Sequence, residues 1–136
     1  MEKVFVDSDI VLDLLSARQP HYIHAAQLFS LADEGAIKIF VSSLSFANVN
    51  YILSKQYNPD QARKKLLKFK TLVSVVSVND KVIELALASD FRDFEDAMQY
   101  SAAIECGLTI LLTRNLKDFK KAEITILTAE QFLKTI

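Results

Sequence analysis

The chain has 136 residues, of which 51% are hydrophobic, and this is enough for one domain with a buried core. We expect a single domain over residues 1–136. The net charge of −1 excludes the globally basic class of proteins that bind nucleic acid by charge alone. Cys106 is the only cysteine, so no disulfide forms within the chain, and we expect a reducing, cytoplasmic location. No apolar run approaches the ~20 residues that span a bilayer, and we expect no membrane partner.

Apolar runs rich in β-branched residues alternate along the chain with patterns typical of helices. In chain order, the predicted elements are a strand over Lys3–Val6, a helix over His21–Glu34, a strand over Ile37–Val41, helices over Ser43–Gln56 and Pro59–Lys70, a strand over Leu72–Val76, helices over Asp80–Ser89 and Asp93–Cys106, a strand over Thr109–Leu112, a weaker strand over Glu123–Leu127 and a helix over Thr128–Leu133. This alternation favours parallel strands and a sheet covered on both faces. We therefore predict an α/β fold, a three-layer α/β/α sandwich with a central, mostly parallel sheet of four to five strands.

Local signals mark several helix ends. Pro20 occupies what we expect to be the first turn of its helix, and Asn58 is a predicted cap for the helix that starts at Pro59. Thr128 and Gln131 have the spacing of a capping box. We expect Cys106 to be a small buried residue rather than a nucleophile.

The first predicted strand runs directly into Asp7, Ser8 and Asp9. An unpaired carboxylate is costly to bury, so we place Asp7 at the open end of the strand. In sheets of this kind, ligands bind beyond the carboxyl ends of the strands, which makes Asp7 a candidate site residue. A second interpretation is that Ser8 or Asp9 caps a helix starting near Ile10.

The helix predicted from Asp93 opens with three acids. Favourable interaction with the helix dipole explains Asp93 and Glu95 as well as a functional role does. Asp96 precedes a long apolar stretch and lies one turn before Tyr100, so we expect it to face inward, near the strand ends.

Oxygen-bearing side chains also follow the fourth predicted strand, at Thr113 and Asn115, although turn chemistry explains Asn115 about equally well. Asp7, Asp96 and Asn115 are expected to converge from three distant segments. Clustered carboxylates repel one another unless a cation lies between them, and Mg²⁺ prefers oxygen ligands. Such an ion can activate water and stabilise charge on a phosphodiester.

Four segments, in this order and spacing, resemble the PIN-domain family over nearly the whole chain: VFVDSDIVLDLL, VSSLSFANVNYIL, DFEDAMQYSAAIECG and TILLTRNLKDF. The resemblance implies a PIN-like sheet of parallel strands, Mg²⁺ or Mn²⁺ as cofactor, and endonucleolytic cleavage of RNA. Many small bacterial members resemble VapC-like toxins, which implies a partner antitoxin and a homodimer.

The resemblance also assigns site residues. Asp7 and Asp96 match the first and third metal-binding acids of the family, and Thr113 matches a small hydroxyl residue near the metal. Asn48 falls where the family usually has a glutamate, and Asn115 falls where a fourth aspartate is common. The implied catalytic residues are Asp7, Asp96, Asn48, Asn115 and Thr113. The implied metal ligands are Asp7 and Asp96, with Asn48, Asn115, Asp9 and Asp93 as further candidates.

An amide keeps an oxygen ligand but loses the negative charge, so Asn48 and Asn115 predict weaker metal binding. Asp9, Asp93 or Glu95 would compensate. The expected function is that of a metal-dependent endoribonuclease, the toxin of a toxin–antitoxin pair. Two alternatives stay open: a weak or inactive PIN-fold module that binds RNA or protein, and a phosphohydrolase using Asp7 and Asp9 as an Asp-x-Asp motif.

Two groups of basic residues are candidates for RNA contacts. Six lie within Lys55–Lys70, where we favour a solvated helix face whose apolar side, with Leu66, Leu67 and Phe69, faces the core. The second group is closer to the predicted site: Arg114, Lys117, Lys120 and Lys121. His21 and His24 are expected to be surface residues in the first turn of their helix.

Overall fold

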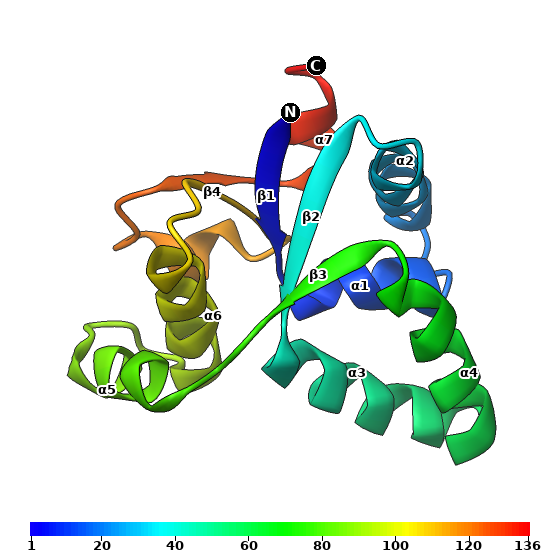
Figure 1. The fold of residues 1–136 in the computed structure, drawn as a ribbon, viewed down its shortest axis with the longest axis horizontal. Coiled ribbons are helices and arrows are strands. Elements are labelled where there is room, and N and C mark those ends of the chain that lie inside the picture. The colour runs from blue at the N-terminus through cyan, green and yellow to red at the C-terminus, as the bar shows by residue number, and fades with distance from the viewer.

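A five-stranded sheet forms the centre of the computed structural model, which describes all residues from 1 to 136. Its order is β3-β2-β1-β4-β5, and every neighbouring pair is parallel (Figure 1). The strands are β1 (Glu2–Val6), β2 (Ile37–Ser42), β3 (Val73–Val76), β4 (Ile110–Leu112) and β5 (Thr125–Leu127). The first four strands each differ from the predicted range by one residue, and β5 begins two residues later than predicted, at Thr125 rather than Glu123.

Helices cover both faces of the sheet, as predicted. They are α1 (Ser8–Leu15), α2 (Tyr22–Asp33), α3 (Ser43–Gln56), α4 (Pro59–Lys70), α5 (Asp80–Ala88), α6 (Phe94–Glu105), the short 3₁₀ helix η1 (Leu116–Phe119) and α7 (Ala129–Leu133). The larger of two hydrophobic cores packs one face of the sheet against α1 to α4 and α7. The smaller core packs the other face against α5, α6 and η1 (Figure 1).

The central strand β1 shows why one sequence can serve both cores. Side chains alternate between the two faces of a strand. Val4 and Val6 belong to the larger core and Phe5 to the smaller one, and all three are fully buried. The strand is therefore continuously apolar, as expected for a parallel strand covered on both sides.

The predicted helix caps at Asn58 and Thr128 are confirmed. The Asn58 side chain accepts a hydrogen bond from the Gln61 amide at 2.8 Å. Thr128 and Gln131 form the full capping box, with hydrogen bonds of 3.1 and 2.9 Å.

Two predictions about helix starts are wrong. Helix α2 begins at Tyr22, and Pro20 lies in the turn before it, where the Tyr22 amide donates to the Arg18 carbonyl at 2.7 Å. Helix α1 begins at Ser8, and its cap is Asp7 rather than Ser8 or Asp9. In both places several neighbouring residues can serve as the helix cap. The local sequence therefore does not determine which residue begins the helix.

Some predictions of burial are also wrong. Cys106 is exposed, because it follows the end of α6 at the surface. Leu67 is 73% exposed, whereas Phe69 is buried in the larger core, so only part of the apolar side of α4 faces inward. None of the helices combines the length and the apolar character that crossing a bilayer requires.

Candidate active site

The strand order reverses at β1, because β2 and β3 lie on one side of it and β4 and β5 on the other. The crevice at such a switch point, beyond the carboxyl ends of the strands, is where α/β sheets bind ligands. Asp7 directly follows β1 and Thr113 directly follows β4. The Asp7 amide donates to the Leu112 carbonyl at 2.9 Å, which extends the pairing of the two strands into the crevice.

Asp7 is only 6% exposed, although it carries a carboxylate. One carboxylate oxygen accepts from the Ser8 amide at 2.7 Å, and the other accepts from the Thr113 hydroxyl at 2.8 Å. Burial and the negative charge of Asp9 raise the pKa of Asp7 to about 8, although these two hydrogen bonds favour the ionised form. Asp7 and Thr113, both named as site residues from the sequence, are thus in direct contact.

Asp9 lies on the other side of the Thr113 hydroxyl. Its Oδ2 accepts from the Arg114 amide at 3.0 Å and lies 3.4 Å from the Thr113 Oγ1. Its Oδ1 is buried and has no hydrogen-bond partner. Burial raises the pKa of Asp9, and the hydrogen bond and charge of Arg114 oppose the shift. The site therefore contains a carboxylate oxygen that the protein itself leaves unsatisfied.

Asp96 approaches from α6. The backbone amide of Asp96 donates to the Asp93 side chain at 2.9 Å, so Asp93 is the cap of this helix. Partial burial raises the pKa of Asp96 to about 7, and the charges of Asp93, Asp118, Glu95 and Asp9 add to the shift. Asp96 in turn contributes to the raised pKa of Asp7, so these acids are close enough to repel one another.

The two asparagines have different surroundings. The Asn48 side-chain amide, on α3, donates a hydrogen bond to Oε1 of Glu95, on α6. The Asn115 backbone amide donates to the Thr113 hydroxyl at 3.1 Å, while its side chain is exposed and does not cap η1. Asn48 therefore pairs with an acid beside Asp96, and Asn115 lies at the rim next to Thr113.

A buried polar network that the sequence analysis missed supports the site from below. The Gln99 side-chain amide donates to the hydroxyls of Ser45 at 2.8 Å and Ser8 at 3.1 Å, and the Gln99 carbonyl oxygen accepts from Ser42 at 2.7 Å. Ser42, Ser45 and Gln99 are almost fully buried. One signal was present in the sequence, because Gln99 is the only strongly polar residue within the apolar stretch after Asp96.

An ion pair between Asp13 and Arg114 was also missed. Asp13 lies one turn after Asp9 on α1, is 1% exposed, and accepts from the Arg114 Nε at 2.8 Å. Its Oδ1 is buried without a partner. A charged residue on the inward side of an otherwise apolar helix is the signal that was available in the sequence.

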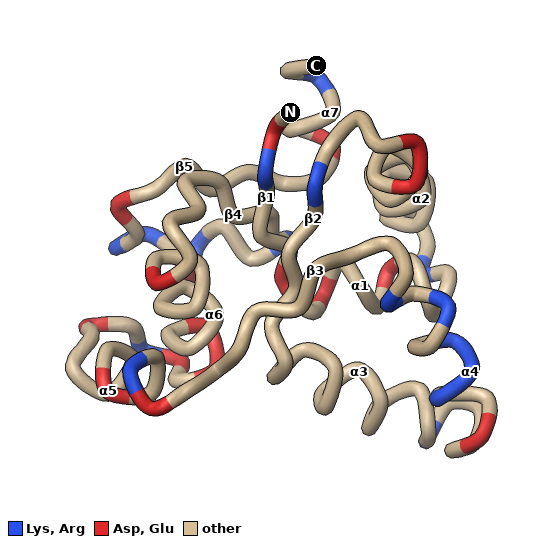
Figure 2. Tube along the Cα trace, in the orientation of Figure 1, with Lys and Arg blue, Asp and Glu red and all other residues tan.

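The metal-ligating atoms near the crevice are carboxylate oxygens of Asp7, Asp9 and Asp96, and no imidazole or thiol hydrogen-bonds to these acids. No three acidic, histidine or cysteine side chains converge closely enough to hold a metal ion by themselves. Figure 2 shows acidic positions around α5 and α6 on one side of the molecule and the basic run on α4 on the other, with the start of α1 between them.

Known proteins share this sequence and fold. The sequence model of the PIN domain family matches residues 3–117 of this chain. Ribonuclease VapC1 of Aquifex aeolicus is 30% identical to this chain over 139 aligned residues, which cover 96% of this chain and 93% of that protein.

Solved structures with lower sequence identity share the fold. VapBC2 from Rickettsia felis, bound to a DNA fragment from its promoter, has a TM-score of 0.68 and 22% identity, and the match covers 92% of this chain and 96% of that one. A toxin–antitoxin complex from Klebsiella pneumoniae has a TM-score of 0.68 and 22% identity over 93% and 97% of the two chains. VapC20 from Mycobacterium tuberculosis, a toxin that cleaves the sarcin–ricin loop, has a TM-score of 0.69 and 18% identity over 90% and 96%. The match to the PIN domain over most of its length shows that the chain belongs to the PIN domain family.

Proposed function

We propose that this chain is an endoribonuclease that hydrolyses RNA phosphodiester bonds with the help of a divalent cation. The observation that carries the proposal is the placement of Asp7 and Asp9 at the switch point of the sheet, with Asp96 near enough to repel them and the pKa values of all three raised. The relative from Aquifex aeolicus, a ribonuclease by name, supports the same reaction.

The residues present fit a hard divalent cation. Without one, Asp7 has a pKa of about 8 and retains a proton near neutral pH, because burial and like charges disfavour its ionised form. A cation between the carboxylates would replace that proton. The unpartnered Oδ1 of Asp9 provides a further buried acceptor nearby.

An oxygen-only set of donors suits Mg²⁺ or Mn²⁺ better than zinc. Asp7 and Asp96 would hold the ion, with Asp9, Asp93, Asn48 and Asn115 as further or indirect ligands. Because no three such side chains enclose a site alone, we expect water to complete the coordination shell, as is usual for Mg²⁺. When bound, the ion supplies a water of lowered pKa and positive charge next to the phosphodiester.

The protein's own part is to fix the carboxylates before substrate arrives. The Thr113 hydroxyl and the Ser8 amide each bind a different oxygen of Asp7, so its carboxylate has one defined orientation. The Arg114 amide does the same for Asp9. Partners of this kind orient metal ligands and are worth about 10- to 100-fold in metal affinity or activity.

Glu95 supplies the negative charge that Asn48 lacks. The Asn48 amide holds the Glu95 carboxylate by a hydrogen bond from α3 to α6. Glu95 is also close enough to Asp96 to raise its pKa. We therefore assign Asn48 as a positioning residue for Glu95, and Glu95 as the acid that compensates for the amide.

We infer the cellular role by analogy with structurally similar proteins. The structural neighbour from Klebsiella pneumoniae was solved as a toxin–antitoxin complex. We propose that this chain is likewise the toxin of such a pair, that it acts on RNA in the cytoplasm as a homodimer, and that an antitoxin protein inhibits it.

Replacing Asp7 with asparagine tests the proposed reaction. Asp7→Asn keeps one oxygen, which can still cap α1 by accepting from the Ser8 amide, but it replaces the other oxygen with an NH2 group and removes the charge that a cation needs. Wild-type protein should cleave single-stranded RNA with Mn²⁺ and lose activity in EDTA, and Asp7→Asn should be at least ~100-fold slower. Asp60→Asn is the matched control, because Asp60 is an exposed acid in the first turn of α4.

Three results would contradict the proposal. Equal cleavage by wild type and Asp7→Asn would point to a contaminating nuclease. Wild-type protein that binds RNA but never cleaves it with Mg²⁺ or Mn²⁺ would favour the inactive binding module. A phosphate trapped covalently on Asp7 would favour the phosphohydrolase.

A further inference from the structure

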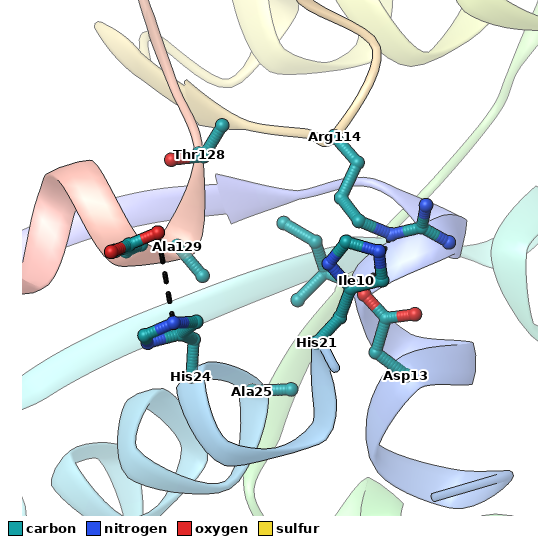
Figure 3. Close-up of a pocket in the computed structure, with 9 residues that line it drawn as sticks. Ile10, Asp13, His21, His24, Ala25, Arg114, Thr128 and Ala129 are labelled. Carbon is teal, nitrogen blue, oxygen red and sulfur yellow. Dashed lines mark hydrogen bonds and ion pairs between the residues drawn. The ribbon is translucent and has the colours of Figure 1, made fainter. Parts of the chain in front are cut away.

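A hollow of about 230 Å³ lies beside the candidate site, enclosed by α1, α2, α7 and the loop after β4 (Figure 3). Its apolar lining consists of Ile10, Ala25 and Ala129. A water molecule in the liquid occupies about 30 Å³, so the hollow has room for roughly seven waters, or for one flat heterocycle with a similar number of heavy atoms.

Arg114 connects this hollow to the active site. Its backbone amide donates to Asp9 at 3.0 Å, and its side chain extends into the hollow, where Nε donates to Asp13 at 2.8 Å (Figure 3). The terminal nitrogens of the guanidinium make no hydrogen bond within the protein, and the side chain is 29% exposed. They are therefore free to donate to a ligand, and the buried Asp13 carboxylate fixes the plane of the guanidinium.

Both histidines of the chain face the same hollow. Figure 3 shows the His21 ring next to Arg114 and Asp13, and the His24 ring paired with Glu130 at 3.6 Å. The sequence analysis treated these histidines as ordinary surface residues, but both are only partly exposed and lie against the hollow. The hollow thus offers two imidazole rings and a guanidinium as flat surfaces, and Glu130 as an acceptor.

We propose that this hollow binds one unstacked base of the RNA strand, next to the phosphodiester that is cleaved. Single-stranded RNA is recognised by splaying out a base, stacking it on aromatic or guanidinium planes, and hydrogen-bonding its edge. A base has an apolar face for Ile10 and Ala129, and an edge whose donors and acceptors match Glu130 and Arg114. This proposal rests on the proposed function for its substrate, because it takes RNA as the ligand.

The composition of the lining disfavours other small ligands. A free phosphate would lie against two carboxylates, Asp13 and Glu130. A metal ion would lie against the Arg114 guanidinium, which already pairs with the Asp13 carboxylate. A purely apolar ligand would leave the terminal guanidinium nitrogens of Arg114 without an acceptor.

The two histidines make a direct experiment possible, because any histidine signal in a proton–carbon NMR spectrum comes from the hollow. Asp7→Asn protein in EDTA would be titrated with the four nucleoside monophosphates and, separately, with ribose 5-phosphate. We expect at least one nucleotide to shift the His21 and His24 signals through the ring current of its base. Ribose 5-phosphate should leave them unchanged.

A second measurement places the base within a strand. Single-stranded RNA of about eight nucleotides would be made with each base removed in turn, and its affinity for Asp7→Asn protein measured by fluorescence anisotropy. Removal of one particular base should weaken binding at least about fivefold. In a variant that also carries His21→Ala and His24→Ala, that position should no longer differ from the others. The control is Tyr22→Ala, an exposed aromatic change on α2 outside the hollow, which should keep the difference.

Arg114 is left intact in these variants, because its removal would leave the Asp13 charge buried and unpaired and would destabilise the fold. Glu130→Gln provides a second test at an exposed position. It should also reduce the difference in affinity between RNA that lacks the particular base and RNA that lacks a base elsewhere.

The outcomes separate this proposal from the proposed function. Cleavage of RNA without any position-dependent base effect would overturn the base site and leave the nuclease standing. An effect of base removal at one position, without any cleavage of RNA by wild type, would support the base site and overturn the nuclease. Histidine signals that respond equally to ribose 5-phosphate, or only to an added partner protein, would also overturn the base site.

Discussion

Asp7 combines two roles with opposite electrostatic requirements. As the cap of α1 it accepts from the Ser8 amide, and a negative charge at a helix start is favourable. As the most buried acid of the site it has a pKa of about 8, so the metal-free protein retains its proton near neutral pH. The unfolded chain would ionise the same group near pH 3.8.

We expect this difference to make metal-free stability fall with rising pH. The folded state binds the extra proton between the unfolded and folded pKa values, so the contribution of Asp7 is complete below about pH 4 and is lost as the pH rises to about 8. The free energy of unfolding of wild type minus that of Asp7→Asn should fall by up to about 1.4 kcal/mol per pH unit in this window. Urea unfolding in EDTA at several pH values measures it.

Subtracting the variant removes the titration of groups that do not interact with Asp7, which is the reason for the paired design. Asp60→Asn, the same substitution at an exposed position, is measured alongside as the control. A difference that rises with pH would show that Asp7 has a depressed pKa, and would remove the argument that it awaits a cation.

The pairing of Asn48 with Glu95 predicts how charge controls metal affinity. Glu95→Gln should weaken Mn²⁺ binding about tenfold, and Asn48→Glu should strengthen it, because a cation gains or loses one neighbouring carboxylate. The double change Asn48→Glu with Glu95→Gln keeps the net charge and should bind nearly as wild type does. Isothermal titration of the apo proteins with Mn²⁺ measures all three.

Glu84→Gln is the control for this series, since Glu84 is an exposed acid on α5. Unchanged affinity in Asn48→Glu would show that this position does not face the metal. A double variant as weak as Glu95→Gln alone would show that the two positions are not interchangeable.

At the scale of elements, the buried network of Ser8, Ser42, Ser45 and Gln99 joins four parts of the fold. Its members belong to α1, the end of β2, α3 and α6, and Gln99 makes hydrogen bonds to the other three. Because these are the elements that carry Asp7, Asn48 and Asp96, the network sets the spacing of the site. Fully satisfied polar networks of this kind favour one unique arrangement.

Gln99→Met should therefore cost stability out of proportion to its change in volume. It removes the three hydrogen bonds that the Gln99 side chain makes to Ser8, Ser42 and Ser45, at a cost of about 1–3 kcal/mol in the free energy of unfolding. Gln27→Met on the exposed side of α2 should change stability by less than about 0.5 kcal/mol. Urea denaturation compares the two, and equal effects would mean that the network adds nothing to the fold.

Some elements could be predicted to the residue, and the reason is local. Helices α3 and α4 have the predicted bounds because a cap at Asn58 and a proline at position 59 separate them. The predicted start of α2 and the predicted cap of α1 were wrong, because neighbouring residues fit the same local rules. The side chains of Ser42 and Gln99 meet across 57 positions, and such a pairing leaves no periodic trace in the sequence.

At the scale of the molecule, alternating strands and helices predict the three layers, but they do not give the order of the strands. Only that order, with β1 between β2 and β4, brings the ends of β1 and β4 together. The positions of Asp7, Asp96 and Asn115 at predicted strand and helix ends supported them as a converging group, whereas Asn48 became a candidate only through the resemblance to a family. The Arg114–Asp13 pair, 101 positions apart, needed the structure itself.

The charge distribution separates two surfaces that the sequence could not rank firmly. Lysines on and near α4 lie far from the acids of the site, and two of this group already cover tyrosine rings, at 5.0 Å for Lys55 on Tyr51 and 4.7 Å for Lys65 on Tyr57 (Figure 2). Lys117, Lys120 and Lys121 instead line a second hollow of about 370 Å³ that also includes Asp93 and Asp118. This second group lies near Asp96, because Asp93 and Asp118 line the same hollow and their charges raise the pKa of Asp96.

Exchanging lysines for glutamines in each group should therefore change RNA binding differently. Each phosphate contact made by a lysine adds about 0.7 to the slope of log affinity against log salt for single-stranded nucleic acid. Lys117→Gln with Lys120→Gln should weaken binding and lower this slope by about 1.4, whereas Lys64→Gln with Lys68→Gln removes the same charge and should leave the slope unchanged. Anisotropy titrations of Asp7→Asn protein between about 50 and 200 mM salt measure both. A loss of slope confined to the α4 pair would place the RNA on the opposite side of the molecule from the acids, and no strand bound there could present its phosphodiester to Asp7.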